Sequence, residues 1–130
     1  MHACFSGKLK IVKYLGTKHS ELINTVDENN NNGLHRASRQ GNLEIVMYLI
    51  ETLKMDPAVK GRYGRNSFIN ACNGGKLEIV KYLATKHPEL INSVDKNNNN
   101  EWLRNFRNFR IVQATIRHNS STAEFFEKFC

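Results

Sequence analysis

The segment KLKIVKYLGTKHSELINTVDENNNN, residues 8–32, returns as KLEIVKYLATKHPELINSVDKNNNN at residues 76–100. The two segments are identical at 20 of 25 positions. A weaker copy lies midway between them, because Gly7, Gly41 and Gly75 are evenly spaced along the chain. The resulting period of about 34 residues is too short for a domain and long enough for one pair of helices. Such units bury their apolar faces against one another, so the sequence predicts a short solenoid.

The middle copy shows the plan of one unit most clearly. Polar residues 27–31 predict a turn, and Asn32 follows where a helix needs an N-cap. Residues 34–40 predict a short first helix, which ends at Gly41 because glycine readily adopts the left-handed conformation. A second helix begins at residue 43, and its apolar side chains recur at helical spacing as one stripe: Val46, Leu49, Ile50 and Leu53.

The flanking copies follow the same plan. Asn66 and Asn100 take the cap position. One turn position alternates between Gly64, Asn30 and Asn98, which are the residue types that best tolerate a positive φ. The asparagine runs keep a fixed register against the caps, so we interpret them as ordered turns and not as linkers. The apolar stripe is rebuilt by two further sets: Leu9, Val12, Leu15 and Leu77, Val80, Leu83.

The middle copy resembles the ankyrin repeat, whose helical signature is L-H-x-A-x-x-x-G-x-L-E-I-V. The matching residues are Leu34, His35, Ala37, Gly41 and 43–46. Residues 63–69 resemble the turn and the T-P-L-H start of the same repeat. The resemblance covers residues 1 to about 100. It implies an all-α solenoid of about 3.5 units, each with a β-turn tip and two antiparallel helices, stacked into a curved array.

The T-P-L-H element departs from the family pattern. It is replaced by residues 32–35, 66–69 and 100–103, which all lack the proline, and its histidine survives only as His35. The cap is kept because asparagine replaces threonine. We predict that His35 makes the hydrogen bond of the family and that the units without this histidine are less stable.

We expect one domain with a partial first repeat (1–32), a second repeat (33–66), a third repeat (67–100) and a degenerate fourth repeat with a C-terminal capping helix (101–130). The first residue aligns with His35, so we interpret the chain as a fragment of a longer array or as starting at a misassigned codon. The capping helix is predicted from an S-x-x-E spacing at residues 121–124. Its apolar face comes from three phenylalanines: Phe125, Phe126 and Phe129.

Composition sets further limits on the chain. The net charge is +7, which favours an acidic protein, nucleic acid or an anionic surface without choosing among them. No apolar run approaches the roughly 18 residues of a membrane span, and the first residues lack a signal-peptide pattern. We therefore expect a cytoplasmic protein. Cys4 and Cys72 share one repeat position about 20 Å apart in the stack, so we expect reduced, buried thiols.

The resemblance to the ankyrin repeat implies a non-enzymatic module for protein–protein interaction. Its partner would contact the turn tips and the exposed face of each first helix. The sequence holds no phosphate-binding glycine loop, no catalytic constellation and no pairing of histidines with cysteines at metal-ligand spacing. We therefore expect no enzymatic activity, cofactor, metal, small-molecule substrate or membrane association, and we expect a monomer.

An arginine pattern gives the candidate binding surface. Arg36 and Arg39 return two repeats later as Arg104 and Arg107, with the second tip between them. Stacking would place six arginines along one concave strip about 20 Å long, and arginine suits carboxylates and phosphates. We predict that this basic surface binds an acidic segment of a protein partner, using Arg36, Arg39, Gln40, Arg62, Tyr63, Arg65, Asn73, Arg104 and Arg107.

Two alternatives to this interpretation stay open. The fold does not require the arginine recurrence, so we interpret it as functional, although a solvated cationic face without a partner is also consistent with it. Nucleic-acid binding is the other alternative, since residues 104–109 interleave basic and aromatic side chains. Phe106 and Phe109 fall on core positions of the family, however, and no nucleic-acid motif is present. We therefore place a protein partner first.

Overall fold

The computed structural model of the chain describes residues 9–22 and 24–98. This part of the chain contains no strand. Its elements in order are α2 (Leu9–Lys18), the 3-10 turn η1 (Ser20–Leu22), α3 (Gly33–Gln40), α4 (Leu43–Met47), the π-helical turn η2 (Tyr48–Thr52), the 3-10 turn η3 (Arg62–Gly64), α5 (Ser67–Asn73), α6 (Leu77–Lys86) and the 3-10 turn η4 (Pro88–Asn92).

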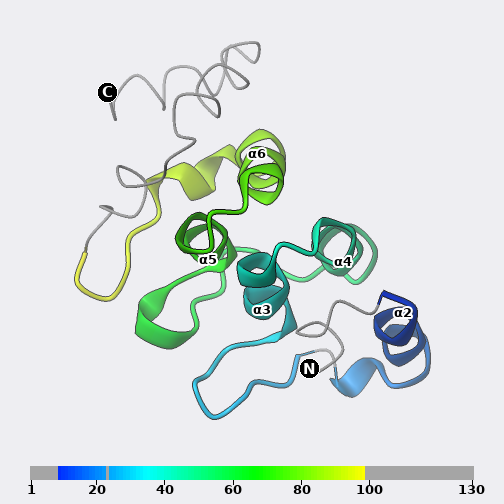
Figure 1. The fold of residues 1–130 in the computed structure, drawn as a ribbon. Coiled ribbons are helices and arrows are strands. Elements are labelled where there is room, and N and C mark those ends of the chain that lie inside the picture. Colours follow the sequence, from blue (N-terminus) through cyan, green and yellow to red (C-terminus); the bar gives the residue numbers. More distant parts are fainter. Residues whose placement is uncertain (1–8, 23, 99–130) are drawn as a thin grey trace.

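The helices form two layers (Figure 1). α3 packs against α5 in one layer, while α4 contacts both α2 and α6 in the other. The loops before α3, before α5 and after α6 project to the same side of the array, away from the second layer (Figure 1). The predicted all-α solenoid of helix pairs with projecting loops is confirmed.

Asparagine side chains begin both of the first-layer helices. The Oδ1 atom of Asn32 accepts a hydrogen bond of 3.0 Å from the His35 N–H, and Nδ1 of His35 accepts one of 2.9 Å from the Asn32 N–H. This reciprocal pair is a capping box in which histidine replaces glutamate. Oδ1 of Asn66 accepts 2.9 Å from the Ile69 N–H, but isoleucine returns no bond. The N-caps predicted at Asn32 and Asn66 are confirmed.

His35 also ties the following loop to its helix. Its Nε2 atom lies 2.7 Å from the carbonyl oxygen of Val59. Because Nδ1 accepts a bond and a carbonyl accepts only, Nε2 carries the proton and the ring is neutral. Burial lowers the pKa of His35 below its usual 6.5, against the opposing effects of the Val59 bond and the nearby Asp27 carboxylate. The ring therefore acts as a neutral structural bridge.

The core is built from equivalent positions of successive units. Val12, Val46 and Val80 lie one repeat apart and are fully buried, as are Leu49 and Leu83 one turn later. Burying equivalent side chains of neighbouring units against one another is how a solenoid makes a continuous core. The predicted stripe is confirmed. The largest fully buried side chains are Phe68, Leu34, Ile45, Leu49, Ile69, Ile79, Leu83, Leu90 and Ile91.

Left-handed residues end the first-layer helices and shape the tips. Gly41 after α3 and Gly75 after α5 have φ values of 88° and 68°. The turn position shared by Asn30, Gly64 and Asn98 has φ values of 64°, 69° and 59°. Helix stops and ordered turns were both expected from the sequence, and both are confirmed.

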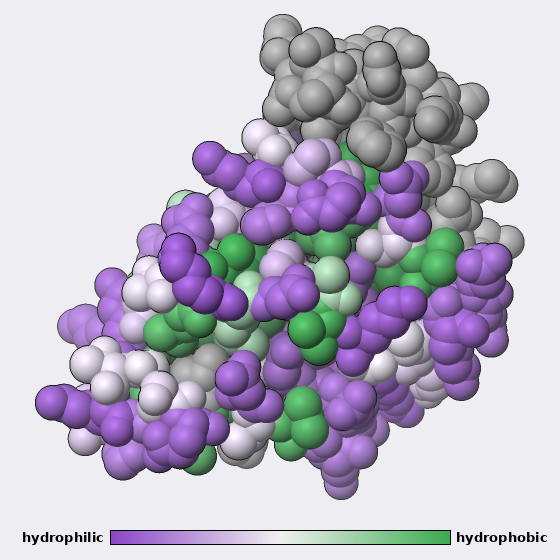
Figure 2. Space-filling model, turned by 180° about the vertical axis from the view of Figure 1, so that it is seen from behind, coloured by the Kyte–Doolittle hydropathy of each residue, from purple (hydrophilic) through white to green (hydrophobic). Residues whose placement is uncertain are grey.

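The face of the described residues that is seen from behind in Figure 2 is largely hydrophilic. Polar side chains cover most of it, with smaller apolar patches between them (Figure 2). No helix in residues 9–22 and 24–98 has the length and apolar character needed to cross a membrane. Cys72 is buried and forms no disulfide, and burial raises its pKa well above the usual value, as expected for an inert thiol. The predictions for Cys4, Asn100 and residues 101–130 lie outside the described residues.

Candidate binding surface

The second turn tip differs from the other two at every position. The first and third tips read D-E-N-N-N (27–31) and D-K-N-N-N (95–99), whereas the second reads G-R-Y-G-R (61–65). The aspartate form is sufficient for a turn, because Oδ1 of Asp27 accepts bonds of 2.8 and 2.9 Å from the N–H groups of Asn29 and Asn31. The second tip replaces this arrangement with two arginines and a tyrosine that a turn does not need.

Tyr63 is held in an uncommon conformation among cations. Its backbone is left-handed with φ 60°, which costs on the order of 1 kcal/mol or more for a residue of this size. Three cationic groups lie 4.6, 5.0 and 5.2 Å from the ring centroid, from Arg62, Arg65 and Lys96 respectively. Cation–π attraction offsets part of the strain. Since 43% of the residue stays exposed, Tyr63 is a candidate contact residue.

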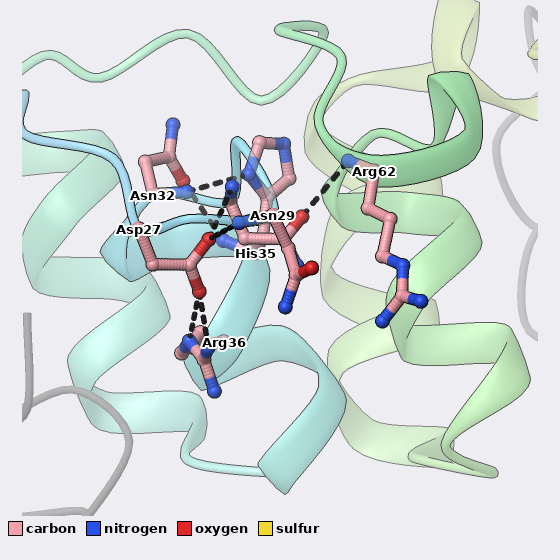
Figure 3. Close-up of polar contacts among 7 residues, drawn as sticks. Asp27, Asn29, Asn32, His35, Arg36 and Arg62 are labelled. Atoms are coloured by element: carbon pink, nitrogen blue, oxygen red, sulfur yellow. Dashed lines mark hydrogen bonds and ion pairs between the residues drawn. The ribbon is translucent and has the colours of Figure 1, made fainter.

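Hydrogen bonds fix the second tip to both neighbouring tips. The N–H of Arg62 donates to Oδ1 of Asn31 at 3.1 Å (Figure 3), and the N–H of Lys96 donates to the carbonyl oxygen of Tyr63 at 2.9 Å. A Cβ atom at Gly61 would collide with the Asn31 side chain. An aspartate at this position would require the Asn31 side chain to move, and the hydrogen bonds to both neighbouring tips set the backbone of the second tip before any partner arrives.

A cavity of about 280 Å³ brings together residues of the first two tips, α3 and α5. In the part of the chain that the structure describes, its lining consists of arginines and asparagines with one tyrosine and no carboxylate: Asn29, Asn31, Arg36, Arg39, Arg62, Tyr63, Arg65 and Asn70. Gln40 lines a smaller adjoining cavity of about 50 Å³. Asn73, at the end of α5, is exposed and lines neither cavity. Arg104 and Arg107 lie outside the described residues.

Arg36 is not a free cation. Its Nε atom donates to a carboxylate oxygen of Asp27 at 2.8 Å, and its Nη2 atom pairs with the same oxygen (Figure 3). Partial burial raises the pKa of Asp27, but hydrogen bonds from the Asn31 N–H, Arg36 and the Asn29 N–H outweigh it, and the net pKa is lowered. The pair joins the first tip to α3, the helix that follows it. Arg36 therefore makes a contact within the array, which the interpretation of the recurring arginines as functional did not include.

Sequence analysis missed this pair although a signal for it exists. The nine-residue spacing between the acid and the arginine recurs as Asp95 and Arg104. Midway between these two pairs, both residues are replaced together, by Gly61 and Asn70. An ion pair between a tip and the helix that follows it predicts that both residues are kept together or replaced together. Asn70 was also missed as a cavity residue. The prediction selected the arginines at this repeat position, Arg36 and Arg104, and Asn70 carries no charge.

No carboxylate among the described residues that line the cavity balances its remaining positive charge. With Arg36 paired, the cationic lining groups are Arg39, Arg62 and Arg65. Arg39 makes no ion pair or hydrogen bond through its guanidinium within the described part of the chain. Guanidinium forks without acidic neighbours are suited to anionic groups. No cluster of three or more His, Cys, Asp or Glu side chains that could hold a metal ion occurs in residues 9–22 and 24–98.

Comparison with known proteins identifies the family. The family model described as "Ankyrin repeats (3 copies)" matches residues 1–100. The chain belongs to the ankyrin-repeat family. In this ankyrin array, the G-R-Y-G-R tip is the segment that departs most from the aspartate form of its own sister repeats.

Curated relatives share only a part of their length with this ankyrin-repeat chain. The mitochondrial liver isoform of glutaminase from Mus musculus is 29% identical over 91 residues, which are 70% of this chain and 15% of that protein. The Rattus norvegicus isoform is 29% identical over 87 residues, which are 67% of this chain and 14% of that protein. The chain thus spans about a seventh of these relatives.

Solved structures share the ankyrin-repeat architecture. A chain in the crystal structure of the yeast ribosomal protein Rps3 in complex with its chaperone Yar1 superposes with a TM-score of 0.62 and 27% identity. The match covers 66% of this chain and 63% of that one. A chain in the complex of the Bdellovibrio bacteriovorus endopeptidase Bd0816 with the immunity protein Bd3460 has a TM-score of 0.74 and 23% identity, covering 92% and 63%. At this lower identity the likeness concerns the fold.

Proposed function

We propose that this ankyrin-repeat chain is a non-enzymatic module for protein–protein interaction, and that it binds its partner through the second tip and the adjoining cavity. The observation that carries the proposal is the G-R-Y-G-R tip, in which a strained, exposed tyrosine is held among cations. The first tip shows that the aspartate form is sufficient to build a turn, so the turn itself does not require the two arginines and the tyrosine. The similar yeast structure is a complex of a ribosomal protein with its chaperone, which is consistent with a protein partner.

The charge of the surface favours an acidic segment of the partner. The chain carries a net charge of +7, and three lining arginines of the cavity have no acidic neighbour in its lining. Opposite charges across an interface speed association and select against wrong partners. Tyr63 would serve as the aromatic anchor, since tyrosine and arginine are enriched among the residues that dominate binding energy. Arg104 and Arg107 belong to the same proposal by their repeat position.

A capture experiment with matched variants tests the proposal. The tagged chain is used to retain proteins from a lysate of its source, as the wild type, as Arg39→Glu and as Tyr63→Asn. Lys10→Glu is the control, because it changes the net charge as Arg39→Glu does and introduces the glutamate found at the equivalent Glu44 and Glu78. The expected result is a protein retained by the wild type and the control and lost from the other two.

The same experiment separates the alternatives. Equal retention on Arg39→Glu, Tyr63→Asn and the wild type would show that this surface is not the interface. Nuclease treatment of the lysate addresses nucleic acid: if it removes everything retained by the wild type, and if binding to any oligonucleotide falls steeply with salt, the protein-partner proposal is replaced by polyanion binding.

A further inference from the structure

The cavity beside the second tip holds more positive charge than one carboxylate requires. Among residues 9–22 and 24–98, its lining includes four arginines and no carboxylate, and the nearby Asp27 pairs with Arg36. Three further arginines therefore line one volume of about 280 Å³, and Lys96 lies next to the Tyr63 ring. A carboxylate brings one charge and two oxygens, and one arginine fork satisfies it. The excess indicates an anion with more charge and more acceptors.

A phosphomonoester has those properties. It carries a charge of about −1.5 to −2 at neutral pH and three strong acceptor oxygens. Three arginines besides Arg36 line the cavity, together with Asn29 and Asn70. The Nδ2 atom of Asn70 donates one hydrogen to the carbonyl oxygen of Asn66 at 2.9 Å and keeps a second one. Charge-assisted hydrogen bonds from guanidinium groups to phosphate are among the strongest in proteins.

The arginines of the second tip are also ordered in advance. Nη2 of Arg62 donates to the Tyr63 hydroxyl at 2.8 Å, and the guanidiniums of Arg62 and Arg65 lie over the tyrosine ring. The tip itself is bonded to Asn31 and Lys96 of the neighbouring tips. Side chains that are held before binding lose less conformational freedom on binding. This arrangement explains why a left-handed tyrosine is kept where an asparagine would relieve the strain.

We infer that the cavity binds the phosphate of a phosphorylated serine or threonine side chain of the protein partner. The inference rests on the proposed function and specifies the group that the surface anchors. Arg39 contributes from α3, Arg62 and Arg65 contribute from the second tip, and the paired Arg36 holds the first tip in place. The partner would then bind only in its phosphorylated form.

Titration with two small probes tests the chemistry. The N-acetyl amides of phosphoserine and of glutamate are added to the ¹⁵N-labelled chain at constant ionic strength, and the arginine Nε–H signals are followed. The expected result is saturable binding of phosphoserine at least about tenfold tighter than of glutamate. Arg39→Gln should weaken the phosphoserine binding, while Lys10→Gln, on the second layer, should not. Equal binding of both probes, or no effect of Arg39→Gln, would overturn the inference.

Phosphatase treatment tests the source of the phosphate. In the capture experiment, the lysate is divided and one half is dephosphorylated before it meets the wild-type chain. Loss of the retained protein from the treated half supports the inference. Retention in both halves overturns it and leaves the proposed protein-binding function standing. Phosphoserine binding in the titration without any retained protein would contradict the proposed function while assigning a phosphate site.

Discussion

Replacing His35 by leucine tests the local account of the fold most sharply. The imidazole accepts a hydrogen bond of 2.9 Å from the Asn32 N–H and donates one of 2.7 Å to the Val59 carbonyl oxygen. Leucine fills the position with an apolar side chain, as Ile69 does one repeat later, and removes both hydrogen bonds. Asn32 is buried, so its N–H would lose its partner at a cost of about 1–3 kcal/mol.

Losing the hydrogen bond to Val59 lowers the free energy of unfolding by a smaller amount. Val59 is 45% exposed, so water can replace the histidine at its carbonyl and the net loss is about 0.5–1 kcal/mol. The expected destabilisation is about 1.5–4 kcal/mol, a large part of the 5–15 kcal/mol typical of a folded domain. Thermal unfolding followed by circular dichroism should show a fall in Tm of at least about 6 °C.

His19→Leu is the matched control for this measurement. His19 is half exposed and lies beside the exposed Glu21, so its replacement should change stability by no more than about 0.5 kcal/mol. If His35→Leu melts at the temperature of the control and the wild type, the capping box and the loop bond do not stabilise the chain. The reasoning about the single retained histidine of the family pattern would then be refuted.

Four further outcomes are expected. The Ser38 hydroxyl is buried and has no hydrogen-bond partner in the described residues, so Ser38→Ala should leave urea stability unchanged or raise it by about 1 kcal/mol, and a loss would contradict this. Gly61→Asp, which restores the sister residue, should lower Tm because its Cβ collides with the Asn31 side chain, whereas an unchanged Tm would show that the tip adapts. The Asp27→Asn and Arg36→Gln variants should be non-additive in a double-mutant cycle by about 0.5–2 kcal/mol, and simple additivity would dismiss the pair. The folded-state pKa of His35 is below 6.5, so as pH falls the unfolded chain binds a proton at this residue before the folded chain does. The free energy of unfolding should therefore decrease as pH drops below about 6.5. His35→Leu should lose this part of the pH dependence of stability.

The parts of the fold that repeat locally were predictable from the sequence. Helix caps and left-handed turn residues depend on a few neighbouring residues, so a similar local sequence gives a similar local geometry. This holds for the caps at Asn32 and Asn66 and for the left-handed Asn30. The buried valines follow from helical spacing alone. The cross-unit contacts were harder: the bond from Arg62 to Asn31 joins two different tips and depends on how the units stack.

The candidate surface was predictable in its residues and not in its arrangement. The repeat positions of Arg39, Arg62 and Arg65 were enough to place them on one side of the array. The sequence did not show that, among the described residues, Arg36 is ion-paired and the other three are not, because the turn brings its partner, Asp27, close to it. It also did not reveal the left-handed tyrosine, since a residue of this size at φ 60° goes against the local preference that sequence reasoning uses.

The central claim is that the second tip and its cavity form the binding surface. The most direct test is the affinity of the captured partner for the wild type and for the Tyr63→Asn/Arg65→Asn double variant, which brings two positions of the tip to the residues of its sisters. The expected result is a folded protein of equal or higher Tm with affinity reduced at least about tenfold. A folded double variant that binds the partner as tightly as the wild type would contradict the claim.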